Sequence, residues 1–98
     1  MKLTFASSGL ALVETDKAHE LKLPVAVIKS ARRKIQVIRM APDERTLRNW
    51  KSLHYEKLLG DRKNEHSIRL NKQWRITFFL HTDHDPHEVE VTAIENYH

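Results

Sequence analysis

EKLLGDRKNEHSIRLNKQWRITFFL, residues 56–80, is the stretch of this 98-residue sequence that decides its fold. Gly60 and Asp61 predict a turn near its start, because glycine tolerates positive φ angles and aspartate hydrogen-bonds the backbone two residues on. Polar and apolar side chains then alternate with a period of two before and after Asn71, which is typical of strands rather than helices. The stretch therefore predicts a turn followed by a β-hairpin with one apolar face and one face carrying arginines.

The register of this predicted hairpin follows from its apolar positions, which are His66, Ile68 and Leu70 in one strand and Trp74, Ile76, Phe78 and Leu80 in the other. For these residues to share a face, the connecting loop must hold an odd number of residues, and residues 71–73 fit. That register places Arg69 directly opposite Arg75. Because opposed like charges destabilise a sheet by up to about 1 kcal/mol, the pair indicates either a site for a polyanion or two solvated arginines.

The length predicts a single domain, residues 1–98, with one modest core. The chain has no cysteine, so it forms neither a disulfide nor a thiolate metal site, which fits a reducing cytosol. The apolar run at the start is too short to span a membrane, and Ser7, Ser8 and Gly9 interrupt it. We therefore expect a soluble, untargeted, cytoplasmic protein.

The formal net charge of +4 is unevenly distributed. Residues 83–98 hold five of the 13 acidic residues and no lysine or arginine, so residues 1–82 carry all 17 bases and the other eight acids, a formal charge of +9. Such a basic body favours phosphate backbones as partners, although merely soluble basic proteins share this composition.

The N-terminal half predicts one strand, at residues 2–6, and two helices. Ser7 or Ser8 is a suitable N-cap for a short helix reaching Lys17. Pro24 opens the strongest helix at its first position, where its missing N–H costs nothing. Its apolar face, which we expect to cover the sheet, consists of Ile28, Ala31, Ile35 and Ile38. Its basic residues are interpreted as a solvated face: Lys29, Arg32, Arg33, Lys34 and Arg39.

Beyond Pro42, the sequence predicts three apolar core contacts, from Leu47, Trp50 and Leu53. Trp50 is interpreted as a packing residue rather than a platform for base stacking. Residues 53–58 predict a third strand, and residues 89–94 predict the last one.

The loop HTDHDPH, residues 81–87, contains five possible metal ligands. Its spacing matches no standard zinc pattern, and hairpin loops are commonly rich in such residues. We therefore interpret it as a polar loop and expect no metal site.

Four spaced motifs resemble the HigB branch of the RelE/ParE toxin superfamily, the toxin halves of bacterial type II toxin–antitoxin modules. They are Gly60-Asp61-Arg62, Ser67-Ile68-Arg69, Trp74-Arg75-Ile76-Thr77-Phe78 and the terminal Tyr97-His98. The resemblance covers essentially the whole chain in length and element order. It implies an α+β, RelE-like fold, in which an N-terminal strand and two helices pack on one face of a small twisted antiparallel sheet. It places the active surface on the opposite, concave face.

The resemblance also implies cleavage of messenger RNA on the ribosome, without a metal or other cofactor. Such cleavage needs a base for the ribose 2′-OH, cations for the phosphorane-like charge and an acid for the departing 5′-oxygen. Arg75 corresponds to the family's arginine at the scissile phosphate, Tyr97 and His98 to its terminal catalytic pair, and Glu56 to a position held by His or Glu. Additional RNA contacts are expected from Arg62, Lys63, Arg69 and Lys72.

Two departures from the family pattern predict a weak nuclease. Asn96 stands where many members have an acid, and Leu59 stands where many have a lysine. The implied partners are messenger RNA on the ribosome, a HigA-like helix-turn-helix antitoxin and, only through it, operator DNA. The alternative hypothesis is a non-catalytic module that inhibits a protein target, as the ParE branch does with DNA gyrase.

Overall fold

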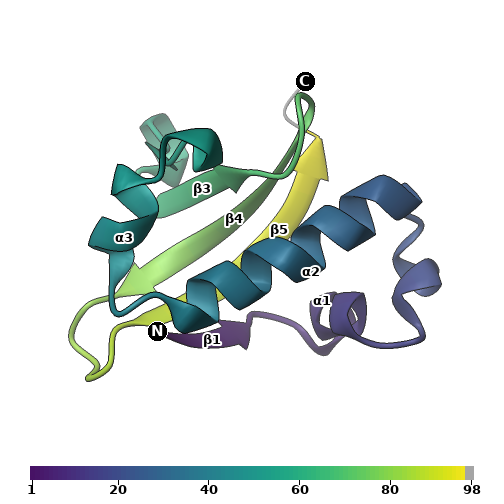
Figure 1. Ribbon diagram of the computed structural model, residues 1–98, viewed down its shortest axis with the longest axis horizontal. Helices are drawn as coiled ribbons and strands as arrows, with labels where there is room; N and C mark the ends of the chain where they lie inside the picture. Colours follow the sequence, from purple (N-terminus) through teal and green to yellow (C-terminus); the bar gives the residue numbers. More distant parts are fainter. Residues whose placement is uncertain (97–98) are drawn as a thin grey trace.

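The computed structural model describes residues 1–96, which form a five-stranded sheet with helices on one face (Figure 1). The strands are β1 (Lys2–Phe5), β2 (Glu56–Lys57), β3 (Glu65–Arg69), β4 (Trp74–His81) and β5 (Glu88–Asn96). The α-helices are α1 (Ser8–Ala11), α2 (Val25–Met40) and α3 (Glu44–Asn49). Short 3₁₀ helices connect them: η1 (Leu12–Glu14), η2 (Ala18–Leu21), η3 (Lys51–Leu53) and η4 (Gly60–Arg62). The predicted α+β class is confirmed.

The sheet has the order β1-β5-β4-β3-β2, and its pairs are antiparallel except for β1 and β5, which run parallel. The sheet is therefore mixed, rather than purely antiparallel as predicted. Tight hairpins force their two strands to be antiparallel, whereas β1 reaches β5 through the rest of the chain and is free of that constraint.

The predicted β3–β4 hairpin is confirmed in register. Ile68 lies opposite Ile76 and Arg69 opposite Arg75. The backbone N–H of Leu70 donates to the carbonyl oxygen of Trp74 at 2.8 Å, which closes a loop of three residues. The Asn71 side chain accepts hydrogen bonds from two backbone N–H groups of this turn, so it fixes the loop that the parity argument required.

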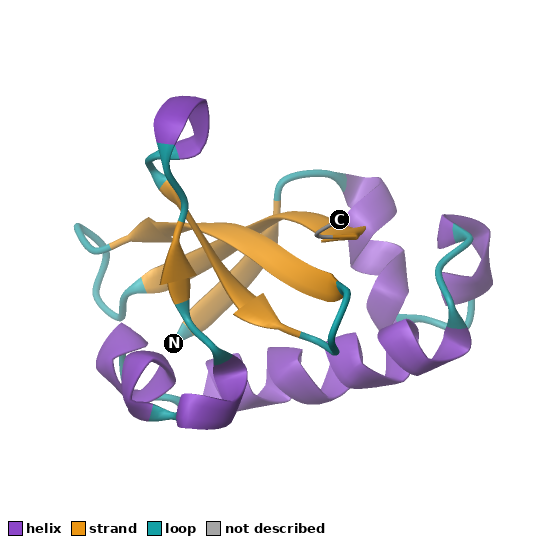
Figure 2. Cartoon of the chain, turned by 90° about the horizontal axis from the view of Figure 1, so that it is seen from above, coloured by secondary structure: helices purple, strands orange, loops and turns teal. Residues whose placement is uncertain are grey.

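Helix α2 lies across one face of the sheet and buries its apolar side against it (Figure 2). The predicted face is confirmed, since Ile28, Ala31, Ile35 and Ile38 are all buried. The Ser30 hydroxyl donates to the Leu70 carbonyl oxygen at 2.7 Å and so ties α2 to the β3–β4 loop. Two of the basic residues predicted to be merely solvated also bind elsewhere: Arg32 donates to backbone carbonyls of Val13 and Thr15, and Arg39 pairs with Glu14.

A β-bulge in β5 keeps the sheet's faces consistent. Ile76 lies opposite Ile94 and Thr77 opposite Ala93, but Phe78 lies opposite Val91, so one residue of β5 is extra. Without the bulge, strict alternation would place Val91 and Ile94 on opposite faces. With it, both belong to the core, and Glu95 lies on the open face of the sheet, opposite Arg75.

Several predicted boundaries are wrong by one turn or less. The first α-helix ends at Ala11 and continues as 3₁₀ only to Glu14. Pro24 is the N-cap of α2 rather than its first helical residue. The third strand is only Glu56–Lys57, because η3 and a left-handed residue occupy the positions before it.

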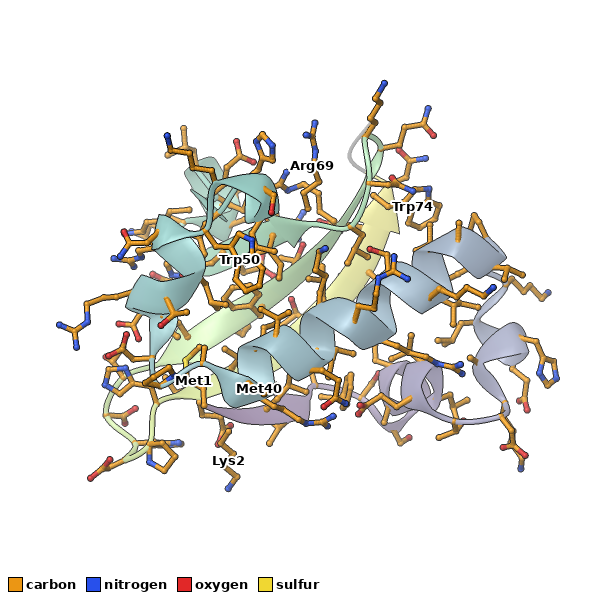
Figure 3. All side chains as sticks on the ribbon, viewed as in Figure 1. Met1, Lys2, Met40, Trp50, Arg69 and Trp74 are labelled. Carbon is orange, nitrogen blue, oxygen red and sulfur yellow. The ribbon has the colours of Figure 1, made fainter. Side chains whose placement is uncertain are left out.

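Trp50 is not the core residue that we predicted. It is 47% exposed, whereas Leu47 and Leu53 are buried. Figure 3 shows the position of Trp50 next to helix α3. Helix α3 ends at Asn49 and Trp50 has extended backbone angles, so its side chain leaves the apolar helical face. It borders a small surface cavity together with Met40.

Among residues 1–96, no helix is both long and apolar enough to cross a membrane.

Candidate active site

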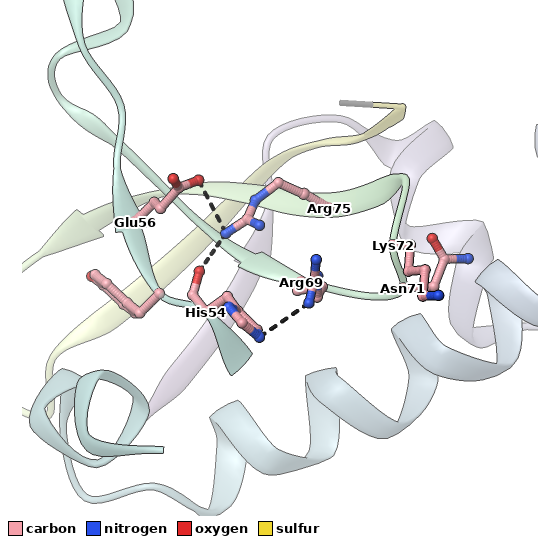
Figure 4. Close-up of a pocket in the computed structure, with 7 residues that line it drawn as sticks. His54, Glu56, Arg69, Asn71, Lys72 and Arg75 are labelled. Carbon is pink, nitrogen blue, oxygen red and sulfur yellow. Dashed lines mark hydrogen bonds and ion pairs between the residues drawn. The ribbon is translucent and has the colours of Figure 1, made fainter. Parts of the chain in front are cut away.

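The face of the sheet opposite α2 carries the candidate site. Its centre is the opposed pair Arg69 and Arg75, on β3 and β4. A cavity of about 400 Å³ opens beside this pair (Figure 4). The cavity is lined by His54, Tyr55, Glu56, Arg69, Asn71, Lys72 and Arg75. Four of the predicted site residues, at positions 56, 69, 72 and 75, therefore lie together.

Arg75 lies on the predicted face but is itself buried, with 7% of its surface exposed. Its Nε donates to the Ser67 hydroxyl at 2.8 Å, and its terminal nitrogen Nη2 donates to the His54 carbonyl oxygen. The same nitrogen lies 3.4 Å from a carboxylate oxygen of Glu56. These partners fix the guanidinium on several sides, so Arg75 presents a cation whose orientation is set before any ligand arrives.

His54 is the residue that the sequence analysis missed. Its Nε2 lies 3.0 Å from a guanidinium nitrogen of Arg69, so the imidazole lines the same cavity as Glu56 (Figure 4). Its backbone is left-handed, with φ 46° and ψ 54°, a conformation in which histidine is enriched among non-glycine residues. The chain has seven histidines and nothing singled this one out, although its place two residues before Glu56 was a usable signal.

Arg62 is not among the residues that line this cavity, and two carboxylates hold it. It is 2.7 Å from Glu65 and 2.8 Å from Glu95, so it joins η4 to the sheet. Hydrogen bonds to Glu65 and Glu95 raise the pKa of Arg62, and the Arg62 partner lowers the pKa of Glu65. Lys63 is exposed at the end of η4.

The other predicted positions divide into two groups. Asn96 and Leu59, the two departures, are both exposed and line a second cavity on the same face. Tyr97 and His98 lie outside the described residues, so their predicted roles stay predictions.

Histidines of the 81–87 loop form pairs with glutamates. His81 is 2.8 Å from Glu90, and His87 is 2.7 Å from Glu44. Within residues 1–96 no three His, Cys, Asp or Glu side chains are grouped closely enough to hold a metal ion.

Together, the cavity brings a preset guanidinium, a second arginine, a lysine, an imidazole and a carboxylate to one surface. Guanidinium groups bind phosphate oxygens in a fixed fork geometry, and imidazole and carboxylate groups transfer protons. The arrangement suits a phosphate group bound next to side chains that can transfer protons.

Comparison with known proteins gives the same class. Residues 3–91 match the family model described as RelE-like toxin of type II toxin-antitoxin system HigB. Toxin HigB-1 of Vibrio cholerae serotype O1 is 36% identical over 95 residues, which cover 90% of this chain and 99% of that protein.

Solved structures share the fold. A YoeB/ParE toxin from Agrobacterium tumefaciens superimposes with a TM-score of 0.66 over all of both chains, at 16% identity. YoeB from Staphylococcus aureus, solved as a dimer, gives 0.51 at 18% identity and covers this chain fully and 97% of its own.

The family model, together with the shared fold, places the chain among the RelE-like toxins. Within that class, the chain belongs to the HigB-like toxins of type II toxin–antitoxin systems. The resemblance inferred from the four motifs is thereby confirmed, and an antitoxin partner follows from the class of system.

Proposed function

We propose that this toxin acts in the cytoplasm as an endoribonuclease that cleaves messenger RNA on the ribosome, with no metal cofactor. A HigA-like helix-turn-helix antitoxin would neutralise it and carry it to operator DNA. The observation that supports the proposal most directly is the single cavity that joins Arg69 and Arg75 to His54 and Glu56. Cationic and acid–base groups are the two kinds of chemistry that RNA cleavage requires.

In the proposed reaction, the ribose 2′-oxygen attacks the neighbouring phosphorus and the bond from phosphorus to the 5′-oxygen breaks. His54 or Glu56 removes the 2′-OH proton, and a second acid, for which Tyr97 and His98 remain candidates, protonates the departing 5′-oxygen. Arg75 stabilises the charge that builds up on the phosphate oxygens. The products are a 2′,3′-cyclic phosphate and a free 5′-hydroxyl.

Glu56 has two consequences for this reaction. Its carboxylate lies beside the Arg75 guanidinium, so it partly offsets the charge that a phosphate would meet. It is also placed to accept a proton next to a bound phosphate. This arrangement agrees with the expectation of a weak nuclease.

The same ion pair favours the alternative, a module that inhibits a protein target such as DNA gyrase without catalysis. A cation that is 7% exposed and paired with a carboxylate serves well as a structural bridge. Asn96 stands where many family members have an acid, and this also favours the non-catalytic alternative.

The test compares Arg75→Lys with wild type in primer extension on translated messenger RNA. Lysine keeps the charge but loses the fork, so cleavage should fall about 10²- to 10³-fold, as when one preset donor is removed. Arg33→Lys, an exposed arginine of α2, is the control and should cleave normally. Unchanged cleavage by Arg75→Lys, with an unchanged melting curve, would place the site elsewhere.

Bacterial growth provides a second test of the proposed function. Induced expression should slow bacterial division, and co-expression of the antitoxin should restore it. Growth inhibition by a wild-type protein that cleaves no messenger RNA would favour the alternative.

A further inference from the structure

A second cavity, of about 330 Å³, opens on the same face of the sheet, between η4 and the last residues of β5. It is lined by Leu58, Leu59, Arg62, Ser67, Thr77, Glu95 and Asn96. In Figure 2, η4 is the short helix that stands away from the sheet, at the top of the view. The cavity therefore has one wall from the sheet and one from this projecting segment.

Two leucines form the apolar part of the projecting wall. Leu59 is 87% exposed, and Leu58 beside it is half-buried. An exposed leucine alone is ordinary. Here, however, it borders a cavity whose opposite wall is polar, and that combination suits a flat ligand with an apolar face and a polar edge.

The polar wall is built around Glu95. Its Oε1 lies 2.8 Å from a guanidinium nitrogen of Arg62 and accepts a hydrogen bond from the Thr77 hydroxyl at 3.1 Å. Both contacts engage the same oxygen, so within the described residues Oε2 is the oxygen left to accept from a ligand. The Arg62 charge offsets that of Glu95, so an anionic backbone can approach.

This second cavity adjoins the candidate active site. Ser67 lines it and also accepts the hydrogen bond from Arg75 Nε. Glu95 lies directly opposite Arg75 in the sheet. A ligand that places a phosphate on Arg75 therefore has its adjoining group within reach of Glu95.

We propose that this cavity binds the nucleobase next to the phosphate held by Arg75, and that Glu95 selects bases with an exocyclic amino group over uracil. The inference rests on the proposed RNA-cleaving function for its biological role. Adenine, cytosine and guanine each carry an amino group that donates to a carboxylate oxygen. Uracil has carbonyl oxygens at both positions flanking its N–H, and these repel a carboxylate. The leucines contact the face of the base.

The test measures nucleotide binding directly, so it does not depend on cleavage. Wild-type protein is titrated with AMP, CMP, GMP and UMP while the backbone N–H signals of Thr77 and Leu59 are followed by NMR. UMP should bind at least about fivefold more weakly than the other three nucleotides, the lower bound for a specific base contact. Equal affinities, or no binding at millimolar concentrations, would overturn the proposal.

Glu95→Gln is the decisive variant. The glutamine oxygen can keep the contacts to Arg62 and Thr77, while its N–H₂ group replaces the acceptor Oε2 by a donor. The preference against UMP should therefore disappear or reverse. Glu90→Gln, on the same strand but paired with His81, is the matched control and should keep the wild-type preference. An unchanged preference in Glu95→Gln would reduce Glu95 to a structural partner of Arg62.

Leu59→Ser tests the apolar wall at a position too exposed to affect folding. It should weaken binding of all four nucleotides by a similar factor, and unaltered binding would count against that wall.

Selective nucleotide binding by a protein that cleaves no messenger RNA would leave this inference standing and refute the proposed nuclease. Cleavage of messenger RNA without any base preference at the cut site would refute this inference and leave the proposed nuclease standing.

Discussion

The position of the Arg75 side chain depends on the backbone of His54. The His54 carbonyl accepts from Arg75, and the His54 ring contacts Arg69. The left-handed backbone of His54 is what turns its carbonyl and its ring toward the two arginines. A substitution at this position therefore tests chemistry only if it preserves that backbone.

His54→Asn meets this condition, since asparagine tolerates the left-handed region. An imidazole is the side chain best suited to exchange protons at neutral pH. If His54 is the general base, the rate of messenger RNA cleavage should fall about 10²- to 10⁴-fold. The melting temperature should change little. His19→Asn, at an exposed position in η2, is the control, and equal cleavage by both variants would leave Glu56 as the base.

His66 gives stability a dependence on pH. It is buried between Tyr55 and Phe78, and its Nδ1 lies 2.9 Å from the Tyr55 hydroxyl. Burial, assisted by the charge of Arg48, lowers the pKa of His66. The unfolded chain therefore takes up this proton first. The contribution of neutral His66 to stability is complete above about pH 6.5. It is lost as pH falls from there through the lowered pKa of His66 in the folded state.

Urea unfolding at pH 7.5 and 5.5 measures this effect. Wild type should be less stable at pH 5.5, and His66→Phe should lose less stability between the two pH values. The carboxylates with lowered pKa, Asp43, Glu44, Glu65 and Glu88, lose their contribution only as pH falls below about 4.5, outside this window. The same decrease in both proteins would exclude His66 as the cause.

The pairing of Arg69 with Arg75 was predictable, because parity together with a three-residue loop determines it. His54 was not, because its position depends on a 3₁₀ turn and a left-handed residue where the sequence pattern favoured a strand.

The short helix η4 has no buried residue. Gly60 has φ +69° and its surroundings are open, and the ion pairs of Arg62 bind this segment to β3 and β5. Partly exposed ion pairs contribute little to global stability, typically 0–1 kcal/mol. Their effect here is local, since they hold the wall of the second cavity in place.

Arg62→Met should therefore separate local order from global stability. The midpoint of urea unfolding should shift only slightly, while hydrogen exchange at the backbone N–H groups of residues 60–63 should become faster. Messenger RNA cleavage should also decline. Arg45→Met, which breaks a comparable surface pair with Asp43, is the control and should leave exchange in η4 unchanged. Unchanged exchange in Arg62→Met would show that η4 is ordered by other contacts.

The bulge in β5 is the feature of the strands that the sequence did not predict. The pattern of residues 89–94 predicted a strand, and that strand is present. Alternation alone, however, put Glu95 on the same face as Val89 and Val91. The extra residue moves it to the open face, a shift that depends on how β5 meets β4 and leaves no local mark in the sequence.

For the molecule as a whole, stability depends on one core shared by α2 and the sheet. Phe78 lies within it, fully buried at the centre of β4. Its neighbour Phe79 is on the other face and is 36% exposed. The two positions allow the core to be tested within a single strand.

Phe78→Ala should destabilise the protein by about 3–5 kcal/mol, because it removes a ring and leaves a cavity. That is a large part of the 5–15 kcal/mol typical of a domain. Phe79→Ala should cost much less, about 1 kcal/mol. Urea unfolding measures the free energy of unfolding of both variants. Similar decreases in the two would mean that the core does not lie on the α2 side of β4.

The fold class was predictable through the resemblance of the four motifs to the RelE/ParE superfamily, which implied an α+β fold. The parallel pairing of β1 was not, because these two strands are separated by most of the sequence and no turn specifies their relative direction.

That pairing bears on how the protein is made. β1 has β5 as its strand partner, so residues 2–5 must wait for residues 88–96 before they can join a sheet. Domains generally fold from the N-terminal side as synthesis proceeds, but here the first strand to emerge is unpaired until the last one has been translated. Glu95, which lies opposite Arg75, arrives with that same last strand. Glu95 can therefore reach Arg75 only after β5 has emerged from the ribosome, so the open face that carries the candidate site is completed late in synthesis.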